Sequence, residues 1–274
     1  MKYFCTLSII AALVAGLVIA AQSSSLLFKD TFDVSAYSTN LDFENNLRQS
    51  GSIGPLTYSK TSWIVGLPDY EWWIHLGDPV HPGTLFFNES WGEYAGMLHA
   101  SPNHNFIDST KLRIEVEINP NLGGDPAFHW AGLIFGADSA KNNPLDPGVM
   151  GVTLTRDGGY NVWDNGAFVL GGVLAGHQPG TAMHLVIDTD LPAWDGSLGT
   201  VNISLDGVSI LSNYQRGFTH NYLSMAVLGF RRDNAGQDFT FDNLTVTDMV
   251  PEPGSVYVTA IGLAGLLIKR RRIK

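Results

Sequence analysis

Hydrophobic and polar residues alternate with a period of two in several parts of the chain. The clearest case is KLRIEVEI, residues 111–118, in which every second residue is aliphatic and each residue between is charged. Successive side chains of a β-strand point to opposite faces, so this period is typical of a strand with one buried face and one solvated face. The segment therefore predicts a strand at the boundary of a hydrophobic core.

Turn signals separate further segments of this kind. Asp157-Gly158, Asn165-Gly166 and Asp206-Gly207 are pairs that favour tight hairpin turns. The sequence shows no long amphipathic helix pattern and no internal repeat, so it predicts an all-β fold, an antiparallel sandwich or barrel. Further strands are expected within residues 130–136, 151–169, 183–190, 200–210, 223–230 and 239–248.

Composition favours one folded domain, residues 22–249. Apolar residues make up 45% and charged residues 15% of the 274 positions, which is unlike a disordered chain. No linker-like stretch divides this body, although residues 40–105 fit the strand pattern less clearly and are expected to hold extra strands and loops. The one cysteine, Cys5, precedes the body, which must therefore depend on core size and has no disulfide framework.

Charge narrows the range of partners. Residues 22–249 contain 10 basic and 25 acidic residues, a net charge of −15. A body this acidic repels nucleic acid and anionic lipid, so no nucleic-acid partner is expected. Cations, neutral sugars and basic proteins are compatible with it.

The first 21 residues predict a secretory signal peptide. Lys2 precedes an apolar segment, residues 7–20, and small residues follow around Ala20 and Ala21. A positive start, an apolar centre and a small-residue cleavage site define such a signal. A retained N-terminal anchor is the alternative interpretation.

The last 25 residues, 250–274, contain Pro251, Glu252 and Pro253, then an apolar run, then basic residues that include Arg270, Arg271 and Arg272. As a helix, residues 254–268 would be about 22 Å long, short of the ~30 Å hydrocarbon core. Basic side chains at the end can snorkel and shorten the span that is required. A short membrane helix with its basic end in the cytoplasm is therefore expected.

This tail resembles the PEP-CTERM sorting signal of Gram-negative bacteria, because the Pro-Glu-Pro motif, the short helix and the basic end come in the same order. The resemblance implies export, anchoring in the inner membrane before processing, and cleavage near the motif by an exosortase, which would be a partner. The processed protein would then reside at the cell surface or in the extracellular matrix. Without an exosortase in the host, the tail would act as a plain anchor.

The body resembles the LamG or concanavalin A-like jelly roll. The resemblance is carried by FKDTFD at residues 28–33, WAGLIFG at 130–136, GGYNVWDNG at 158–166, the pair HLVID and VNISLDGVSI, and FTFDNLTV at 239–246. It implies a two-sheet antiparallel β-sandwich.

The resemblance also implies a candidate cofactor, a structural Ca²⁺ where the first and last strands meet. Asp242 matches the terminal-strand position of such a site, and Asp30 or Asp33 would supply the other strand. Thr31 stands where the family usually has an acidic ligand. Ordinary turn and edge aspartates are the alternative interpretation.

Three tryptophans are candidates for binding extracellular polysaccharide. Trp72 has a tryptophan neighbour, so in a strand one ring of the pair must point outward. Trp163 precedes the Asn165-Gly166 turn, and Trp194 lies in a loop rich in Pro, Gly and Asp. Exposed rings can stack on sugar faces, although most aromatic side chains of a sandwich belong to its core.

Catalytic groups are harder to find, so the sequence leans against an enzyme without deciding the question. Glu115 and Glu117 share a strand face about 7 Å apart, a separation compatible with glycoside hydrolysis, but Lys111 and Arg113 make that face charge-balanced and favour a solvated surface. No H-E-x-x-H or G-x-S-x-G motif is present. Three hypotheses stay open: a polysaccharide-binding surface protein, a structural matrix protein without a ligand, and a glycoside hydrolase or polysaccharide lyase.

Overall fold

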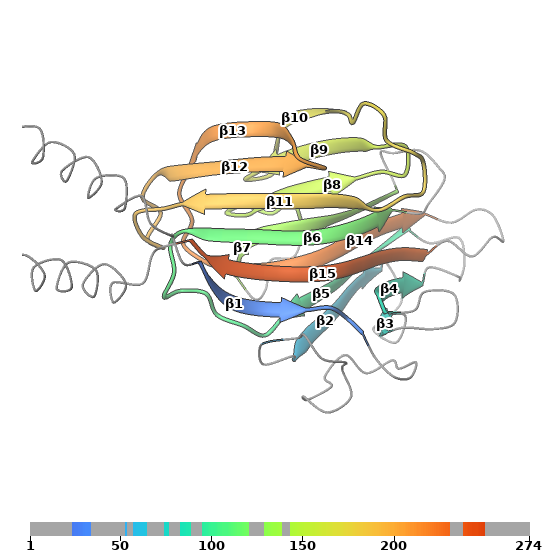
Figure 1. Ribbon diagram of the computed structural model, residues 1–274, viewed down its shortest axis with the longest axis horizontal. Helices are drawn as coiled ribbons and strands as arrows, with labels where there is room; N and C mark the ends of the chain where they lie inside the picture. The colour runs from blue at the N-terminus through green and yellow to red at the C-terminus, as the bar shows by residue number, and fades with distance from the viewer. Residues whose placement is uncertain are drawn as a thin grey trace, which may run out of the picture. The chain divides into compact units, whose positions relative to one another are not determined.

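The computed structural model describes residues 24–33, 53, 57–64, 74–76, 83–88, 95–120, 129–138, 143–230 and 238–249 (Figure 1). The expected signal peptide, the sorting tail with Pro251, Glu252, Pro253 and Arg270–Arg272, and Trp72 lie outside these residues. In the described part, no helix is long and apolar enough to cross a membrane.

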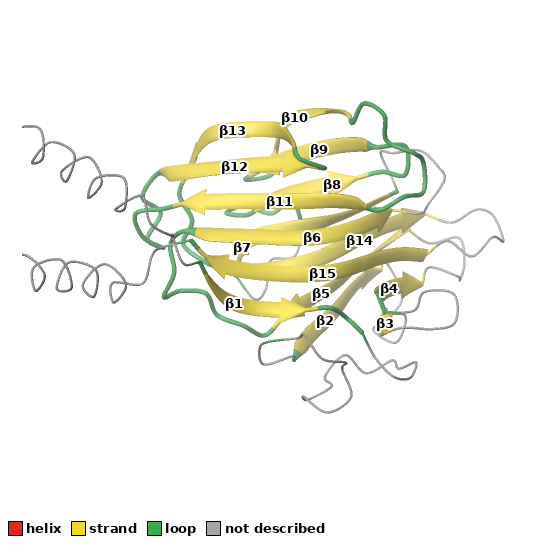
Figure 2. Cartoon of the chain, in the orientation of Figure 1, coloured by secondary structure: helices red, strands yellow, loops and turns green. Residues whose placement is uncertain are grey.

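The described elements are β-strands and the turns between them (Figure 2). Eight of these strands form sheet 1, in the order β13-β12-β11-β6-β15-β4-β3, with β1 pairing to β15. Their bounds are β1 Ser25–Asp30, β3 Ile74–Leu76, β4 Leu85–Asn88, β6 Leu112–Pro120, β11 Met183–Asp190, β12 Gly199–Leu205, β13 Val208–Arg216 and β15 Asp238–Asp248.

Seven strands of the described part form sheet 2, in the order β10-β9-β8-β7-β14-β5-β2. Strands far apart in sequence are neighbours: β14 lies between β5 and β7, and β15 between β4 and β6, all antiparallel. Figure 1 shows sheet 1 in front of sheet 2, so the fold is a two-sheet antiparallel sandwich. The bounds are β2 Tyr58–Ile64, β5 Ala95–Pro102, β7 Trp130–Ala137, β8 Met150–Leu154, β9 Gly159–Asp164, β10 Ala167–Val173 and β14 Tyr222–Phe230.

The main core lies between the sheets. On β6, Leu112, Ile114, Val116 and Ile118 are buried and alternate with partly exposed residues, which confirms the period-two prediction. Aromatic rings fill the interior, for example Phe87 and Phe241, whose centroids are 5.3 Å apart. Burial of this large apolar surface is the main stabilising contribution in a body without cysteine.

The predicted turns are confirmed by the backbone. Asn165 and Gly166 have φ values of 52° and 79°, and Asp206 and Gly207 have 48° and 76°. Two successive positive φ values are characteristic of the type I′ hairpin turn, whose twist matches that of the flanking strands. The Asn165-Gly166 turn joins β9 to β10 and fixes the pairing of Trp163 with Phe168.

A polar cluster ties the two sheets together near their edges. Asp164 of β9 in sheet 2 accepts a hydrogen bond from the Tyr214 hydroxyl of β13 in sheet 1, at 2.9 Å. Nε of Arg216, also on β13, lies 2.7 Å from the other carboxylate oxygen, although not aligned as a hydrogen bond. The guanidinium carbon stands 4.9 Å from the centre of the Phe218 ring.

Candidate binding site

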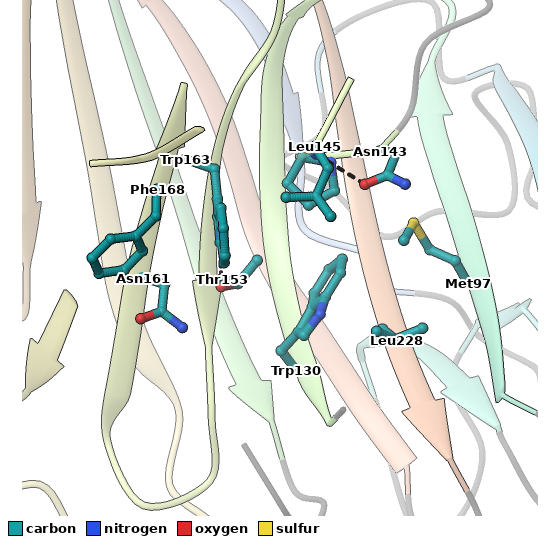
Figure 3. Close-up of a pocket in the computed structure, with 10 residues that line it drawn as sticks. Met97, Trp130, Asn143, Leu145, Thr153, Asn161, Trp163, Phe168 and Leu228 are labelled. Atoms are coloured by element: carbon teal, nitrogen blue, oxygen red, sulfur yellow. Dashed lines mark hydrogen bonds between the residues drawn. The ribbon is translucent and has the colours of Figure 1, made fainter. Parts of the chain in front are cut away.

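A pocket of ≈ 290 Å³ lies on the outer face of sheet 2, the face turned away from sheet 1 (Figure 3). Its floor is formed by side chains from β5, β7, β8, β9, β10 and β14, and one wall is the loop that precedes β8. The described residues that line it are Met97, Trp130, Asn143, Pro144, Leu145, Thr153, Asn161, Trp163, Phe168 and Leu228.

Strand register brings the floor residues together. Thr153 of β8 pairs with Asn161 of β9 on one side and with Gly132 of β7 on the other. Leu228 of β14 pairs with both Trp130 of β7 and Met97 of β5. The pocket therefore has a polar end at Thr153 and Asn161 and an apolar end at Met97, Leu228 and Trp130.

Trp163 is the central ring of the polar end. Its indole N–H donates to the Thr153 hydroxyl oxygen at 3.3 Å, and the Phe168 ring meets it edge-on with centroids 5.5 Å apart. Figure 3 shows the Trp163 ring between Phe168 on one side and Leu145 on the other. Phe168 is 57% exposed, so this aromatic pair is open to a ligand.

Gly171 makes room for that pair. A Cβ at this position would collide with the Asn161 side-chain oxygen and would lie 3.2 Å from the Phe168 ring. Only a residue without a side chain lets the Asn161 amide and the Phe168 ring lie together over β10.

The loop wall is held by hydrogen bonds of its own. Leu145 N–H donates to Asn143 Oδ1 at 2.9 Å, and Asn143 N–H donates to an Asp146 carboxylate oxygen at 3.1 Å. Pro144 packs on Gly151 of β8, where a Cβ would lie 2.5 Å from the proline ring. The wall is thus fixed without a ligand, so binding would lose little conformational entropy in ordering it.

The apolar end belongs to a second hydrophobic cluster on the outer face of sheet 2. This cluster consists of Met97, Trp130, Ile134, Ala137, Val149 and Ala226, and Leu228 packs against it. All eight residues of β7 are buried, because alternate side chains enter this cluster and the main core. The apolar run WAGLIFG therefore encodes a strand that is covered on both faces.

The lining chemistry suits a neutral ligand with apolar patches. No described lining residue carries a carboxyl, amine, imidazole or thiol, and the polar side-chain groups are the Asn143 and Asn161 amides, the Thr153 hydroxyl and the indole N–H groups of Trp130 and Trp163. A mostly apolar concave site with a few convergent polar groups is typical of small-molecule pockets. This arrangement can bind and orient a ligand, and the described lining offers no acid or base, so nothing in it would activate the Thr153 hydroxyl as a nucleophile.

The three tryptophans expected to bind polysaccharide lie in different parts of the chain's structure. Trp163 lies in the pocket, and Trp72 is outside the described residues. Trp194 packs against Phe135 and Phe218 with centroids 6.5 and 6.4 Å away, and its N–H donates to the Ser109 carbonyl oxygen at 2.9 Å. Its half-buried ring is thus engaged with the core. Trp130 and Phe168 were not candidates from the sequence, because their place at the pocket depends on strand pairing.

The calcium candidates lie close enough to interact, since β1 pairs with β15. Burial is the main reason that the pKa of Asp242 is raised to about 7; the hydrogen bond from Asn243 N–H lowers it, and the charges of Glu117, Asp33 and Asp30 raise it. Asp30 accepts hydrogen bonds from Phe32 N–H at 2.8 Å and Tyr58 O–H at 2.7 Å.

A cation near these carboxylates would relieve their mutual repulsion, so the residues fit the expectation in charge. Within the described ranges, no group of three His, Cys, Asp or Glu side chains is arranged to hold a metal ion. The Ca²⁺ site at Asp30, Asp33 and Asp242 therefore stays a prediction.

Glu115 and Glu117 lie on the opposite side of the sandwich from the pocket, on the outer face of sheet 1. Arg113 makes a bidentate ion pair with Asp188 of β11 at 2.8 and 2.9 Å. Lys111 lies 3.0 Å from Asp190, and Glu115 lies 3.8 Å from His184. The charge-balanced face expected from the sequence is thus a row of paired charged and polar side chains on β11, on β6 and on Lys111 just before β6.

Comparison with solved structures identifies the fold. An endo-1,3-beta-glucanase from Streptomyces sioyaensis is similar, with 15% identity and a TM-score of 0.50 over 83% of this chain and 97% of the glucanase. The chain has the concanavalin A-like jelly-roll fold. At this identity the similarity shows the fold alone.

Two further similarities are weaker. The alginate lyase Aly36B has 15% identity and a TM-score of 0.45 over 85% of this chain and 100% of the lyase. The exoplasmic/lumenal domain of VIP36, in a Ca²⁺/Man2-bound form, has 8% identity and a TM-score of 0.44 over 72% of this chain and 84% of that domain. No protein-family model matches the chain, nor does any curated protein sequence.

Proposed function

We propose that this protein binds neutral polysaccharide through the pocket on the outer face of sheet 2. The observation that carries the proposal is the preformed, uncharged pocket in which Trp163 and Phe168 present aromatic surface beside the Asn161 amide. Sugars have apolar C–H faces and polar edges, and such a combination of ring and amide matches both.

Charge favours neutral over acidic polysaccharide. The described pocket lining contains no Lys or Arg to pair with a carboxylate or sulfate group. The body as a whole carries −15, which repels a polyanion. An uncharged glycan needs no basic partner in the pocket and is not repelled by the acidic body.

The sequence patterns at the two ends of the chain support a function outside the cell. The signal peptide at residues 1–21 and the PEP-CTERM-like tail at residues 250–274 support export, temporary anchoring in the inner membrane and processing by an exosortase. The product would be a cell-surface or extracellular-matrix protein. The glucanase of similar fold acts on 1,3-beta-glucan, which is compatible with a polysaccharide ligand here.

Binding of the purified protein to an array of neutral and acidic glycans tests the proposal. Trp163→Ala and Phe168→Ala should weaken binding by about tenfold or more, since each removes a stacking surface. Val173→Ala is the matched control, because Val173 lies on β10 with Phe168, is 72% exposed and does not line the pocket.

The outcome separates the three hypotheses. No binding to any glycan would contradict the proposal and favour a structural matrix protein. Binding that Trp163→Ala leaves unchanged would place the site elsewhere. Release of shortened products from a bound glycan would indicate an enzyme.

A further inference from the structure

We infer that the pocket selects a sugar that carries an N-acetyl group. This inference rests on the proposed function and specifies its ligand. It follows from the contrast between the two ends of the pocket, from the fixed orientation of Asn143 and from the lack of charge in the described lining.

The side chains of the apolar end offer a hydroxyl group one donor, the Trp130 indole N–H, but no oxygen or nitrogen that could accept its hydrogen. Met97, Trp130 and Leu228 lie side by side on β5, β7 and β14, and Met97 and Trp130 are 5% and 7% exposed. An unsubstituted hexose carries hydroxyls around most of its ring, and one of these desolvated without a partner would weaken binding on the order of tenfold. A buried methyl group would instead strengthen binding by about fourfold.

Asn143 supplies a donor beside that end. The Leu145 main-chain N–H can only donate, so the Asn143 side-chain atom that it meets at 2.9 Å is the carbonyl oxygen. The Nδ2 amino group is therefore the other end of the amide, and Figure 3 shows Asn143 beside Met97. Its N–H is placed to donate to the carbonyl oxygen of an acetamido group whose methyl contacts Met97.

The polar end accommodates the ring itself. The Asn161 amide makes no hydrogen bond to other described residues, so it can donate to one sugar oxygen and accept from another hydroxyl. Trp163 is held by Thr153 and Phe168 and offers a stacking surface next to it. One acetylated sugar therefore spans the pocket with its ring at Trp163 and its acetyl group at Leu228.

Neutrality excludes the unacetylated amino sugar. A free amine is protonated at neutral pH and would enter a lining that, in the part described, has no carboxylate to pair with it. Acetylation removes this charge and adds the methyl group. The same sugar in three forms therefore provides a closely matched set of probes.

Titration calorimetry of the full chain with β-1,4-linked oligomers of glucose, glucosamine and N-acetylglucosamine, and with galactose and N-acetylgalactosamine, tests the inference. In at least one sugar series, the acetylated form should bind at least tenfold more tightly than the forms without acetyl. Saturation-transfer NMR should show the acetyl methyl protons receiving the largest saturation, because they lie deepest.

Asn143→Asp is the decisive variant. It keeps the oxygen that accepts from Leu145 N–H but replaces the amino donor by a charged oxygen, so the preference for the acetylated form should fall to about threefold or less. Asn103→Asp is the control, because Asn103 is an exposed asparagine whose Oδ1 also accepts a hydrogen bond, from Ser59, and whose charge change is the same.

Each outcome is informative. Equal binding of acetylated and unacetylated sugars, or an Asn143→Asp variant with unchanged preference, would overturn the inference and leave the proposed function standing. Tighter binding of glucosamine oligomers would also overturn it and would indicate attraction to the acidic surface. If no sugar of either series bound while other glycans did, the inference would be wrong; if no glycan bound at all, the proposed function would fail with it.

Discussion

Replacing His99 by leucine should remove a large part of the acid sensitivity of this protein. His99 lies on β5, is 4% exposed and points to the outer face of sheet 2 beside its strand partner Ala226. Its Nδ1 makes no hydrogen bond within the described residues. Burial lowers the pKa of His99 to about 4, so the ring is neutral in the folded protein at neutral pH.

Proton linkage gives the direction and the size of the change in unfolding free energy with pH. The unfolded chain binds a proton at His99 below its ordinary pKa of 6.5, whereas the folded protein binds it only below about 4. Folding stability is therefore lost as the pH falls from 6.5 to 4, by roughly 3 kcal/mol in total. This is a large share of the 5–15 kcal/mol that typically separates folded from unfolded protein.

Urea unfolding between pH 8 and pH 4 measures the effect. The difference in unfolding free energy between His99→Leu and wild type should shift by roughly 3 kcal/mol in favour of the variant over this range. Taking the difference cancels the contributions of other groups, including His104, whose pKa is also lowered by burial. Exposed His220→Leu is the control and should follow the wild type.

At neutral pH the leucine variant should be at least as stable as the wild type, since it also removes the unpaired Nδ1 atom. Parallel curves for His99→Leu and wild type from pH 8 to pH 4 would refute the reasoning. They would mean that the imidazole is charged or solvated in the folded protein.

Four further predictions concern other parts of the fold. If Asp242 helps to bind Ca²⁺, the wild-type melting temperature at pH 8 should rise with added Ca²⁺ and fall with EGTA. Asp242→Asn should make the melting temperature insensitive to both additions. An unchanged wild-type melting temperature would exclude the site. Without Ca²⁺, the raised pKa of about 7 makes the wild type lose stability as the pH rises from about 4 to 7, and Asp242→Asn should flatten this slope in chemical unfolding. Tyr214→Phe should lower the unfolding free energy by about 1 kcal/mol, because it removes the hydrogen bond to Asp164 between the sheets; equal urea midpoints would argue against that contact. Gly171→Ala should displace the Asn161 amide and weaken glycan binding in the calorimeter, while the circular dichroism spectrum stays that of the wild type because β10 is an edge strand.

The local features of the fold could be predicted from the sequence because they depend on near neighbours. Alternation placed β6 within two residues of its bounds, with its apolar side chains buried. The Asn165-Gly166 and Asp206-Gly207 pairs predicted their turns because few other residues adopt positive φ without strain. The short strands β4 and β3, by contrast, are held by pairing with β15 and with β4, respectively, and leave only a weak local pattern in residues 40–105.

The candidate site could be predicted only in part because it is built by pairing across the sheet. Trp163 could be singled out because it precedes a turn, whereas Trp130 was one more apolar residue of an expected strand, and only the structure shows that this strand is buried. Its neighbours Leu228 and Met97 come from segments about a hundred and thirty residues apart, joined through β14. The signal in the sequence was the continuous apolar run on β7, which requires cover on both faces of the strand.

The contrast between β6 and β7 supports a ligand role for sheet 2. Both are inner strands of their sheets, yet β6 turns charged residues outward. On that solvated face, Arg113 pairs with Asp188. β7 turns Trp130 and Ile134 outward instead, and a pocket remains between Trp130 and the fixed loop at Pro144. A hollow lined by apolar atoms forfeits dispersion contacts that close packing would supply, so it adds nothing to the stability of the sandwich. The bonded loop that keeps this hollow open, together with Gly171 at its rim, is what a site for a ligand requires.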